Sequence, residues 1–216
     1  LKDEIKECLK VMAWNLYDSH GFKIDFFVDA SNFIFKQPIQ DKFPEFFEEL
    51  TGIAKGAQVN VDELILWNNI ASLSYALPKI KHYLDEMPEL KKKYGHLLEA
   101  LTDSGPMAGG SSDKCSAFMA LGDYTHDGKI CCAHNSFDEF IDGQYFNTII
   151  DIKPSKGNRI LYQAAPGYIA SQTDFFVNSK GFIGTETTMG GFIAYKHSAP
   201  ILCRIRNCMQ YANTLD

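Results

Sequence analysis

The sequence predicts an α+β protein whose sheets are mostly antiparallel, and three observations lead to that fold class. Up to about residue 100, apolar residues recur every three or four positions, as in a helix that buries one face. From residue 115 the apolar period becomes two, which is typical of short strands. A helical pattern returns at residue 199, so helices, a meander of strands and a last helix follow one another.

The first half is expected to be helical because apolar stripes run between charged residues. The stretch Asp3–Tyr17 places Leu9 and Met12 in such a stripe. Asn60 is a candidate N-cap, and Glu63 three residues later completes an Asx version of the capping box. Helices are expected at Asp3–Tyr17, Phe43–Ile53, Val61–Leu77, the charged and solvated Pro88–Leu101, and Ala199–Leu215.

The second half is expected to form a meander of six short strands. Segments rich in Gly, Pro, Asp and Ser separate the apolar runs and favour turns. Asp127-Gly128 between two such runs is a strong hairpin signal. The strands are expected at Cys115–Leu121, Lys129–His134, Phe146–Ile152, Arg159–Ala164, Asp174–Asn178 and Gly181–Thr187.

Length and composition exclude several classes of protein. The 216 residues suffice for one sizeable domain or two small ones, and 45% apolar with 22% charged residues is ordinary for a globular chain. No apolar run approaches the ~20 residues of a membrane-spanning helix. The net charge of −6 disfavours nucleic acid as a partner, and Lys91–Lys93 is interpreted as a solvated helix face. No CxxC pair or His-x-x-x-His array indicates zinc, and no metal or organic cofactor is expected.

Aromatic and cysteine residues have plain structural interpretations. The phenylalanine-rich region between Phe22 and Phe47 is expected to be core, with the border of an acyl-chain pocket as the alternative. Cys131 and Cys132 are expected to be small core residues. Cys203 and Cys208 are either core residues or one disulfide.

The junction between the halves carries the chemical interest. The segment 103–113 is rich in Gly and Ser and separates a helical segment, 1–114, from a strand-rich segment, 115–216. It delivers Cys115 to the start of the first strand, where a cysteine is more often a core residue than a nucleophile. If the Lys114–Cys115 bond were cut, the new α-amine, with a reference pKa of ~7.7–8.0, would be a suitable base for the thiol on the same residue.

Four segments, in this order, carry a resemblance to a known family. They are Leu50-Thr-Gly-Ile-Ala-Lys-Gly-Ala57 with Val61-Asp-Glu-Leu-Ile-Leu-Trp-Asn68, then Cys115-Ser-Ala-Phe118, Ala133-His-Asn-Ser-Phe137, and the block from Ser171 to Thr188 that ends in Glu-Thr-Thr. Together they resemble the phospholipase B-like (lamina ancestor) family of N-terminal-nucleophile hydrolases and the related penicillin acyltransferase-type amidohydrolases. Ser136 and Phe137 stand where that family has Thr-Trp.

The resemblance implies a fold and a set of site residues. The fold would be an αββα sandwich with mostly antiparallel sheets, matured by autocatalytic cleavage before Cys115. Cys115 would be the nucleophile and its amine the base. Asp138 would orient that amine. His134 and Asn135 would flank the thiol from the neighbouring strand. Thr187 and Thr188 would line the site, one of them as a polar support or oxyanion donor.

These inferences predict a hydrolase of amide or ester bonds that acts on a small acyl amide, a peptide or a phospholipid. The alternative is an uncleaved, non-catalytic binding member of the same fold. The resemblance and the absence of an initiator Met at Leu1 favour a secreted, periplasmic or lysosome-like location. Six strands are too few for two facing sheets, so the C-terminal portion of the same protein is expected as a second chain.

Overall fold

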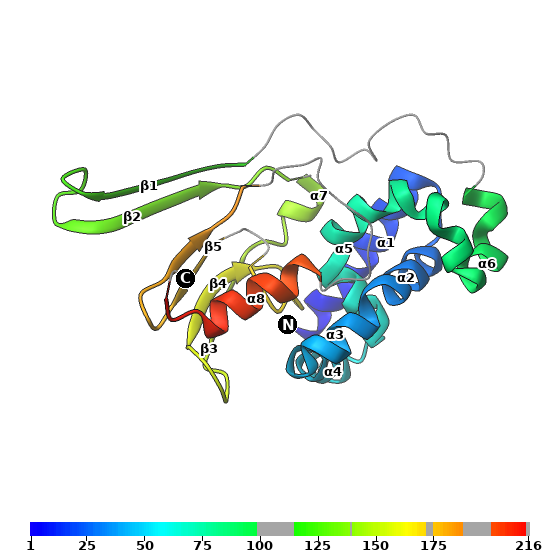
Figure 1. Cartoon of the computed structure of the whole chain (residues 1–216), viewed down its shortest axis with the longest axis horizontal. Helices are drawn as coiled ribbons and strands as arrows, with labels where there is room; N and C mark the ends of the chain where they lie inside the picture. The colour runs from blue at the N-terminus through cyan, green and yellow to red at the C-terminus, as the bar shows by residue number, and fades with distance from the viewer. Residues whose placement is uncertain (99–114, 139, 172–174, 188–199, 215–216) are drawn as a thin grey trace.

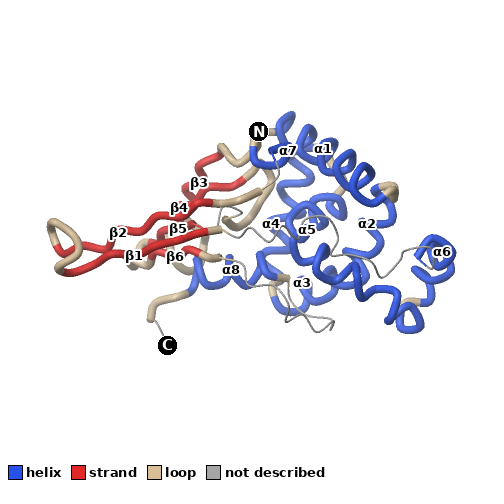
Figure 2. The backbone as a smooth tube through the Cα atoms, turned by 90° about the horizontal axis from the view of Figure 1, so that it is seen from above, coloured by secondary structure: helices blue, strands red, loops and turns tan. Residues whose placement is uncertain are grey.

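The computed structural model describes residues 1–98, 115–138, 140–171, 175–187 and 200–214. The helices of the first half gather at one end of the molecule and the strands at the other, and the last helix lies beside the strands (Figures 1 and 2). The strands pair only with antiparallel neighbours in these ranges, so the α+β class is confirmed. None of the described helices is both long and apolar enough to cross a bilayer.

The helical end begins with a long amphipathic helix and contains the largest core. The first helix, α1 (Lys2–His20), is capped by Gly21, whose φ of 72° lets its N–H reach the carbonyl oxygen of Tyr17 at 2.7 Å. The helix α5 begins after Asn60, whose Oδ1 accepts the Asp62 N–H at 2.9 Å, as the sequence predicts for an N-cap. The helices are α1 (Lys2–His20), α2 (Ile24–Ser31), α3 (Gln37–Lys42), α4 (Pro44–Ala57), α5 (Val61–Ile80) and α6 (Pro88–Leu98), with a π-helical turn at Asn32–Lys36 and a 3₁₀ turn at Lys81–Glu86.

Helix α5 is the centre of this core. Four consecutive residues, Leu64 to Trp67, are all buried, because α1, α2 and α4 pack around the helix. The indole N–H of Trp67 donates to the carbonyl oxygen of Pro166 at 3.0 Å. The Asn68 amide donates to the Gly167 oxygen and accepts the Ile169 N–H, both at 3.0 Å. The helical end is therefore hydrogen-bonded to the loop that follows the fourth strand.

The phenylalanine-rich region is helical core, which confirms its principal interpretation. Phe26, Phe27 and Phe46 are buried, and the first two contact each other edge to face at 5.1 Å between ring centres. The sequence predicted no element between Phe22 and Phe43, whereas the structure has α2, the π-helical turn and α3 there.

All six predicted strands are present in two separate sets. A four-stranded sheet has the order β3-β4-β5-β6, and β1 and β2 form a hairpin that extends away from the helices (Figure 1). The hairpin turns at Gly128, whose φ is 72°, so the Asp127-Gly128 signal is confirmed. The strands are β1 (Ser116–Gly122), β2 (Gly128–Asn135), β3 (Thr148–Ile152), β4 (Ile160–Ala164), β5 (Phe175–Asn178) and β6 (Ile183–Thr185).

Helix α8 (Ile201–Tyr211) joins the sheet to the helices. Its Arg206 is buried and forms two hydrogen bonds to the Glu49 carboxylate of α4, at 3.0 and 2.8 Å. The same guanidinium donates to the Ile169 carbonyl oxygen and lies over the Phe46 ring. This buried ion pair connects α4, α8 and the loop after β4.

The positions of the cysteines contradict one prediction about burial and exclude the predicted alternative of a disulfide. Cys131 is exposed and Cys132 half-buried, so their assignment to the core was wrong; a two-stranded hairpin has no second layer to bury them. Cys203 is buried and Cys208 exposed, and both are free thiols, so the disulfide alternative is excluded. The exposed side chains of Lys91 to Lys93 on α6 confirm a solvated helix face.

Candidate functional site

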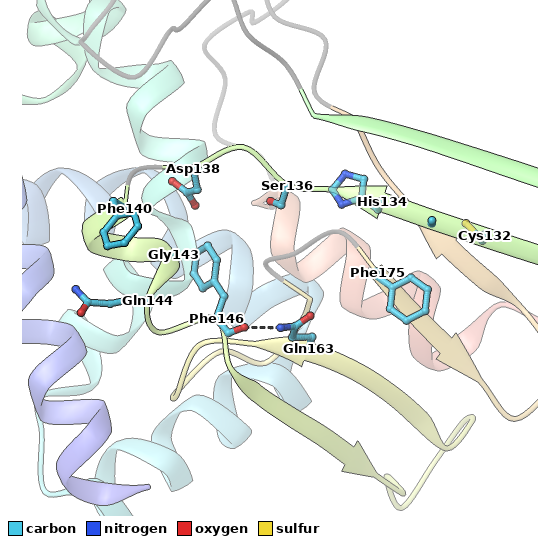
Figure 3. Close-up of a pocket in the computed structure, with 11 residues that line it drawn as sticks. Cys132, His134, Ser136, Asp138, Phe140, Gly143, Gln144, Phe146, Gln163 and Phe175 are labelled. Carbon is cyan, nitrogen blue, oxygen red and sulfur yellow. Dashed lines mark hydrogen bonds between the residues drawn. The ribbon is translucent and has the colours of Figure 1, made fainter.

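A cavity of about 680 Å³ lies where β2 enters the loop toward α7 (Phe140–Gly143), beside β4 and β5 (Figure 3). Its volume is within the range of roughly 300–1,000 Å³ that is typical of small-molecule sites. Polar side chains come from several elements: His134, Ser136, Asp138, Gln144 and Gln163 line the cavity.

Three phenylalanines complete the principal lining. Phe140 is the first residue of the short helix α7, Phe146 follows that helix, and Phe175 begins β5. Phe140 is 93% exposed, so its ring forms a rim rather than a packed wall. The site thus combines hydrogen-bonding groups with uncovered aromatic surface.

The register of the hairpin places Cys115 beside this cavity. Ser116 pairs with Asn135 and Ala117 with His134. One position further along the ladder, Cys115 lies opposite Ser136, and directly opposite side chains share a face of an antiparallel ribbon. His134, two residues before Ser136, points to that same face. The ladder therefore brings the Cys115 thiol and the His134 imidazole to one side of the hairpin as diagonal neighbours.

The Cys115 sulfur has a specific hydrogen-bond partner. The backbone N–H of Phe137 donates to Sγ at 3.3 Å, across 22 residues of chain. This N–H faces the atom that becomes negatively charged when a thiol ionises to the nucleophilic thiolate. The half-buried Cys115 is thus held against the loop that lines the cavity.

The other predicted site residues are placed in three different ways. Asp138 lines the cavity on the far side of Ser136 from His134 (Figure 3). Asn135 points to the opposite face and donates to the Ser116 hydroxyl at 3.4 Å. Thr187 is exposed, two residues after β6, while Thr188 and Lys114 lie outside the described residues.

Two buried polar atoms near the cavity have no hydrogen-bond partner in the described parts of the chain. One is Nε2 of His134, and the other is Oγ1 of Thr185 on β6, a strand that contacts β2. Buried polar groups are normally paired, so such atoms are candidates for contact with a ligand. Thr185 also lies directly opposite Phe175 in the β5–β6 ladder.

Sequence reasoning missed Thr185, Gln163 and Phe175. The Gln163 amide donates to the Phe146 carbonyl oxygen, and the Ser171 hydroxyl donates to the Gln163 carbonyl oxygen at 3.2 Å. Ser171 Oγ in turn accepts the Phe175 N–H at 2.9 Å. These residues belong to strands that only the tertiary fold brings to β2. Of these three residues, only Thr185 could have been found from the sequence. It lies two residues before Thr187, a predicted site residue, so alternation along a strand puts both side chains on the same face.

A buried tyrosine lies near the carboxylates of this region. Burial raises the pKa of the Tyr168 hydroxyl well above its ordinary value, and the negative charges of Asp142 and Asp138 add to the rise. Tyr168 therefore remains a neutral phenol at physiological pH. Its ring contacts Trp67 at 4.9 Å between ring centres, which fixes it in the helical core.

Comparisons with protein-family models, with curated proteins and with solved structures found no match to this chain. The side chains that the structure describes contain no group of three or more His, Cys, Asp or Glu residues placed to hold a metal ion. The functional interpretation therefore depends on the cavity, the thiol beside it and the hydrogen bonds that position both.

Proposed function

We propose that this chain is a hydrolase of acyl amides or esters whose nucleophile is the Cys115 thiol, freed as an N-terminal residue by autocatalytic cleavage of the Lys114–Cys115 bond. The observation that carries the proposal is the Phe137 N–H bound to Cys115 Sγ at 3.3 Å, beside a cavity of substrate size. The Phe137 N–H would stabilise the thiolate form of Cys115, which is the nucleophile that attacks an acyl carbon, and it holds the sulfur against the loop whose residues Ser136 and Asp138 line the cavity.

Self-cleavage would proceed as an N-to-S acyl shift followed by hydrolysis. The Cys115 sulfur attacks the Lys114 carbonyl carbon, the C–N bond breaks, and the departing nitrogen takes the thiol proton to become the α-amine. Water then attacks the thioester, which releases the Lys114 carboxylate and restores the thiol. Both steps use groups of the chain and water alone.

Turnover would repeat this chemistry on a substrate acyl carbon. The α-amine takes the thiol proton, the thiolate forms an acyl-enzyme, and the ammonium returns the proton to the leaving amine or alcohol. Water then releases the acid and regenerates the thiol. A base on the nucleophilic residue itself explains why no separate histidine needs to contact the sulfur.

The neighbouring residues would hold the substrate and the amine. His134 offers an imidazole Nε2 on the nucleophile's face of the hairpin, and Asp138 is the carboxylate that would orient the amine. Asn135 would act indirectly, because its amide holds Ser116 next to the nucleophile. Thr187 and Thr188 would supply polar support from the segment after β6.

The proposed fold is the αββα sandwich, completed by a second sheet layer from the C-terminal portion of the same protein. The hairpin supports this. Phe118 and Met119 are neighbours on β1, so their side chains point to opposite faces of the hairpin. Phe118 is 58% exposed and Met119 is 51% exposed. Both faces of the hairpin thus carry apolar side chains that a further layer would cover.

The test is a time course of intact mass. The purified chain should convert into two species, residues 1–114 and 115–216, and Cys115→Ala should remain whole. Cys131→Ala is the matched control, because it removes an exposed thiol from the same hairpin and should cleave at the wild-type rate. A wild-type chain that stays intact through prolonged incubation, or a Cys115→Ala chain that is cut, contradicts the proposal; the former result favours an uncleaved binding protein.

A further inference from the structure

Strands β2 and β6 contact each other, and each carries a buried polar atom that has no hydrogen-bond partner among the residues that the structure describes. The two atoms are Nε2 of His134 and Oγ1 of Thr185. Buried polar atoms in folded proteins are normally hydrogen-bonded, because a buried group that loses its contact with water and gains no partner is costly. Two such atoms on contacting strands beside a cavity point to a ligand.

His134 lies within reach of a ligand that meets the nucleophile. It lines the cavity (Figure 3) and shares a face of the hairpin with Cys115 as its diagonal neighbour. Diagonal neighbours across an antiparallel ribbon are about 7–8 Å apart. One residue of an extended peptide spans at most roughly 3.3–3.6 Å. A peptide-like ligand whose acyl carbon meets the Cys115 sulfur therefore brings to His134 a group one or two residues further along its chain.

The register of β6 turns the Thr185 side chain toward the same cavity. Thr185 pairs with Phe175, which lines the cavity, and directly opposite side chains share a face. On the other face the Phe176 ring occupies the space that a Cβ at Gly184 would need, which fixes the pairing. Phe176 packs against the hydrophobic core, so Phe175 and Thr185 point away from it. The hydroxyl and the imidazole thus approach the cavity from two different strands.

These two groups suit a ligand group that both donates and accepts a hydrogen bond. A hydroxyl can do either, and a neutral imidazole has one donor and one acceptor nitrogen. A secondary amide carries one N–H and one C=O, which point to opposite sides in the trans form. It can therefore pair with groups on two strands at once, whichever nitrogen of His134 carries the proton. A ligand hydroxyl offers both functions at one atom only.

We propose that His134 Nε2 and Thr185 Oγ1 form an amide-binding subsite, which holds a secondary amide one or two residues from the bond that Cys115 attacks. The inference rests on the proposed function and deepens it, because it makes a peptide-like amide the substrate class rather than a lipid ester. A ligand without this amide leaves buried polar groups of the subsite unpaired, and the site discriminates against it for that reason. The subsite uses neither the Cys115 α-amine nor the Asp138 carboxylate that would orient it.

Binding to the full chain carrying Cys115→Ala tests the subsite without cleavage or turnover. Two uncharged probes share a phenylacetyl amide: N-phenylacetylglycine methylamide has the second amide, and N-butyl phenylacetamide replaces that amide by methylenes. Titration calorimetry gives the ratio of their dissociation constants. We expect Thr185→Val and His134→Leu each to reduce the advantage of the methylamide probe about tenfold, because each variant leaves one group of the bound amide without its partner. The butyl probe should bind Thr185→Val no more weakly than the parent chain.

Matched variants assign the effect to the Thr185 hydroxyl. Thr185→Ser keeps a hydroxyl and should keep the advantage of the methylamide probe. Thr51→Val makes the same change at an exposed position of α4 and should alter neither affinity. Thr185→Val should not lower the melting temperature, since the hydroxyl that it removes is unpaired among the described residues. Because both probes bind the same variant, their ratio does not depend on the fraction of the chain that is folded.

An advantage of the methylamide probe that survives Thr185→Val or His134→Leu would overturn the inference, as would equal binding of the two probes to the parent chain. N-(2-hydroxybutyl) phenylacetamide should bind more weakly than the methylamide probe; equal or tighter binding would show that the subsite holds a hydroxyl and would also overturn it. Since the assay needs no reaction at Cys115, a chain that never cleaves but shows the amide preference refutes the proposed function alone. A chain that cleaves without this preference refutes the inference alone.

Discussion

The helical end and the β1–β2 hairpin carry similar apolar side chains, but these are buried in the helical end and exposed in the hairpin. In the helical end the apolar stripes of α1, α2 and α4 close around α5, and Phe27 is fully buried. In the hairpin Phe118 and Met119 remain mostly exposed on opposite faces. A helical bundle supplies its own covering layers, whereas a two-stranded ribbon supplies none. The stable part of the chain is thus its scaffold, and the proposed chemistry lies where the weakly supported hairpin meets it.

The largest expected contrast comes from one substitution made in both regions. Phe27→Ala should lower the free energy of unfolding by about 3–5 kcal/mol, because it leaves a cavity in a close-packed core. Phe118→Ala should change it by no more than about 0.5 kcal/mol, because that ring is largely in water already. Urea unfolding followed by far-ultraviolet circular dichroism measures both. Similar losses for the two variants would show that the hairpin is packed in solution.

A smaller effect is expected from the buried ion pair. Arg206→Met should lower the free energy of unfolding by about 2–3 kcal/mol, below the usual 3–5 kcal/mol, because the Glu49 side chain is 26% exposed and can regain water. Arg159→Met is the matched control: Arg159 also makes two hydrogen bonds to one carboxylate, that of Asp151, at 2.7 and 2.5 Å, but on the surface. Its loss should be close to experimental error. Equal losses of unfolding free energy in the two variants would show that burial of the arginine does not make its ion pair more important for stability.

Buried and exposed cysteines should also differ in their reactivity toward a thiol reagent. Burial raises the pKa of the Cys8 thiol to about 12 and that of Cys203 to about 12, from an ordinary value of 9.0. Iodoacetamide at pH 8 should therefore label Cys131 and Cys208 in the native protein and leave the two buried thiols unlabelled until the chain unfolds. Peptide mass mapping after a timed quench identifies the labelled sites.

The same pKa values set a direction for stability. The folded state keeps protons on Cys8 and Cys203 that the unfolded chain releases near pH 9. Their contribution is complete below pH 9 and is lost as pH rises from 9 toward 12. Cys203→Ala should flatten this fall, which thermal melts at pH 8, 9 and 10 would detect. An equally steep fall in the variant would exclude Cys203 as a contributor.

Sequence predicted those elements whose apolar period is unambiguous. All six strands and the helices around Leu9, Asn60 and Leu90 follow from the spacing of their apolar residues. The helices between Phe22 and Phe43 escaped prediction because consecutive phenylalanines, such as Phe26-Phe27, leave no polar face from which to read a period. Burial on the hairpin was mispredicted for Cys131 because alternation marks a strand's faces but not whether another layer covers them.

The candidate site was predictable only where it follows the chain. The family resemblance singles out Cys115, His134 and Asp138, and the hairpin predicted at Asp127-Gly128 brings them near one another because they lie on that hairpin and its exit loop. Gln163 and Phe175 belong to other strands and reach the cavity through tertiary packing, which no local pattern encodes. The part of the lining that β4 and β5 contribute therefore became visible in the structure alone.

The most direct test of the account is to trap the acyl-enzyme. The cleaved protein would be incubated with an N-phenylacetyl 4-nitroanilide, quenched in acid within the first turnovers and digested for peptide mass mapping. We predict release of nitroaniline and a phenylacetyl group on the peptide that begins with Cys115, with neither present in Cys115→Ala. Nitroaniline release that persists in Cys115→Ala, or a phenylacetyl group on any other residue of an active protein, would contradict the account.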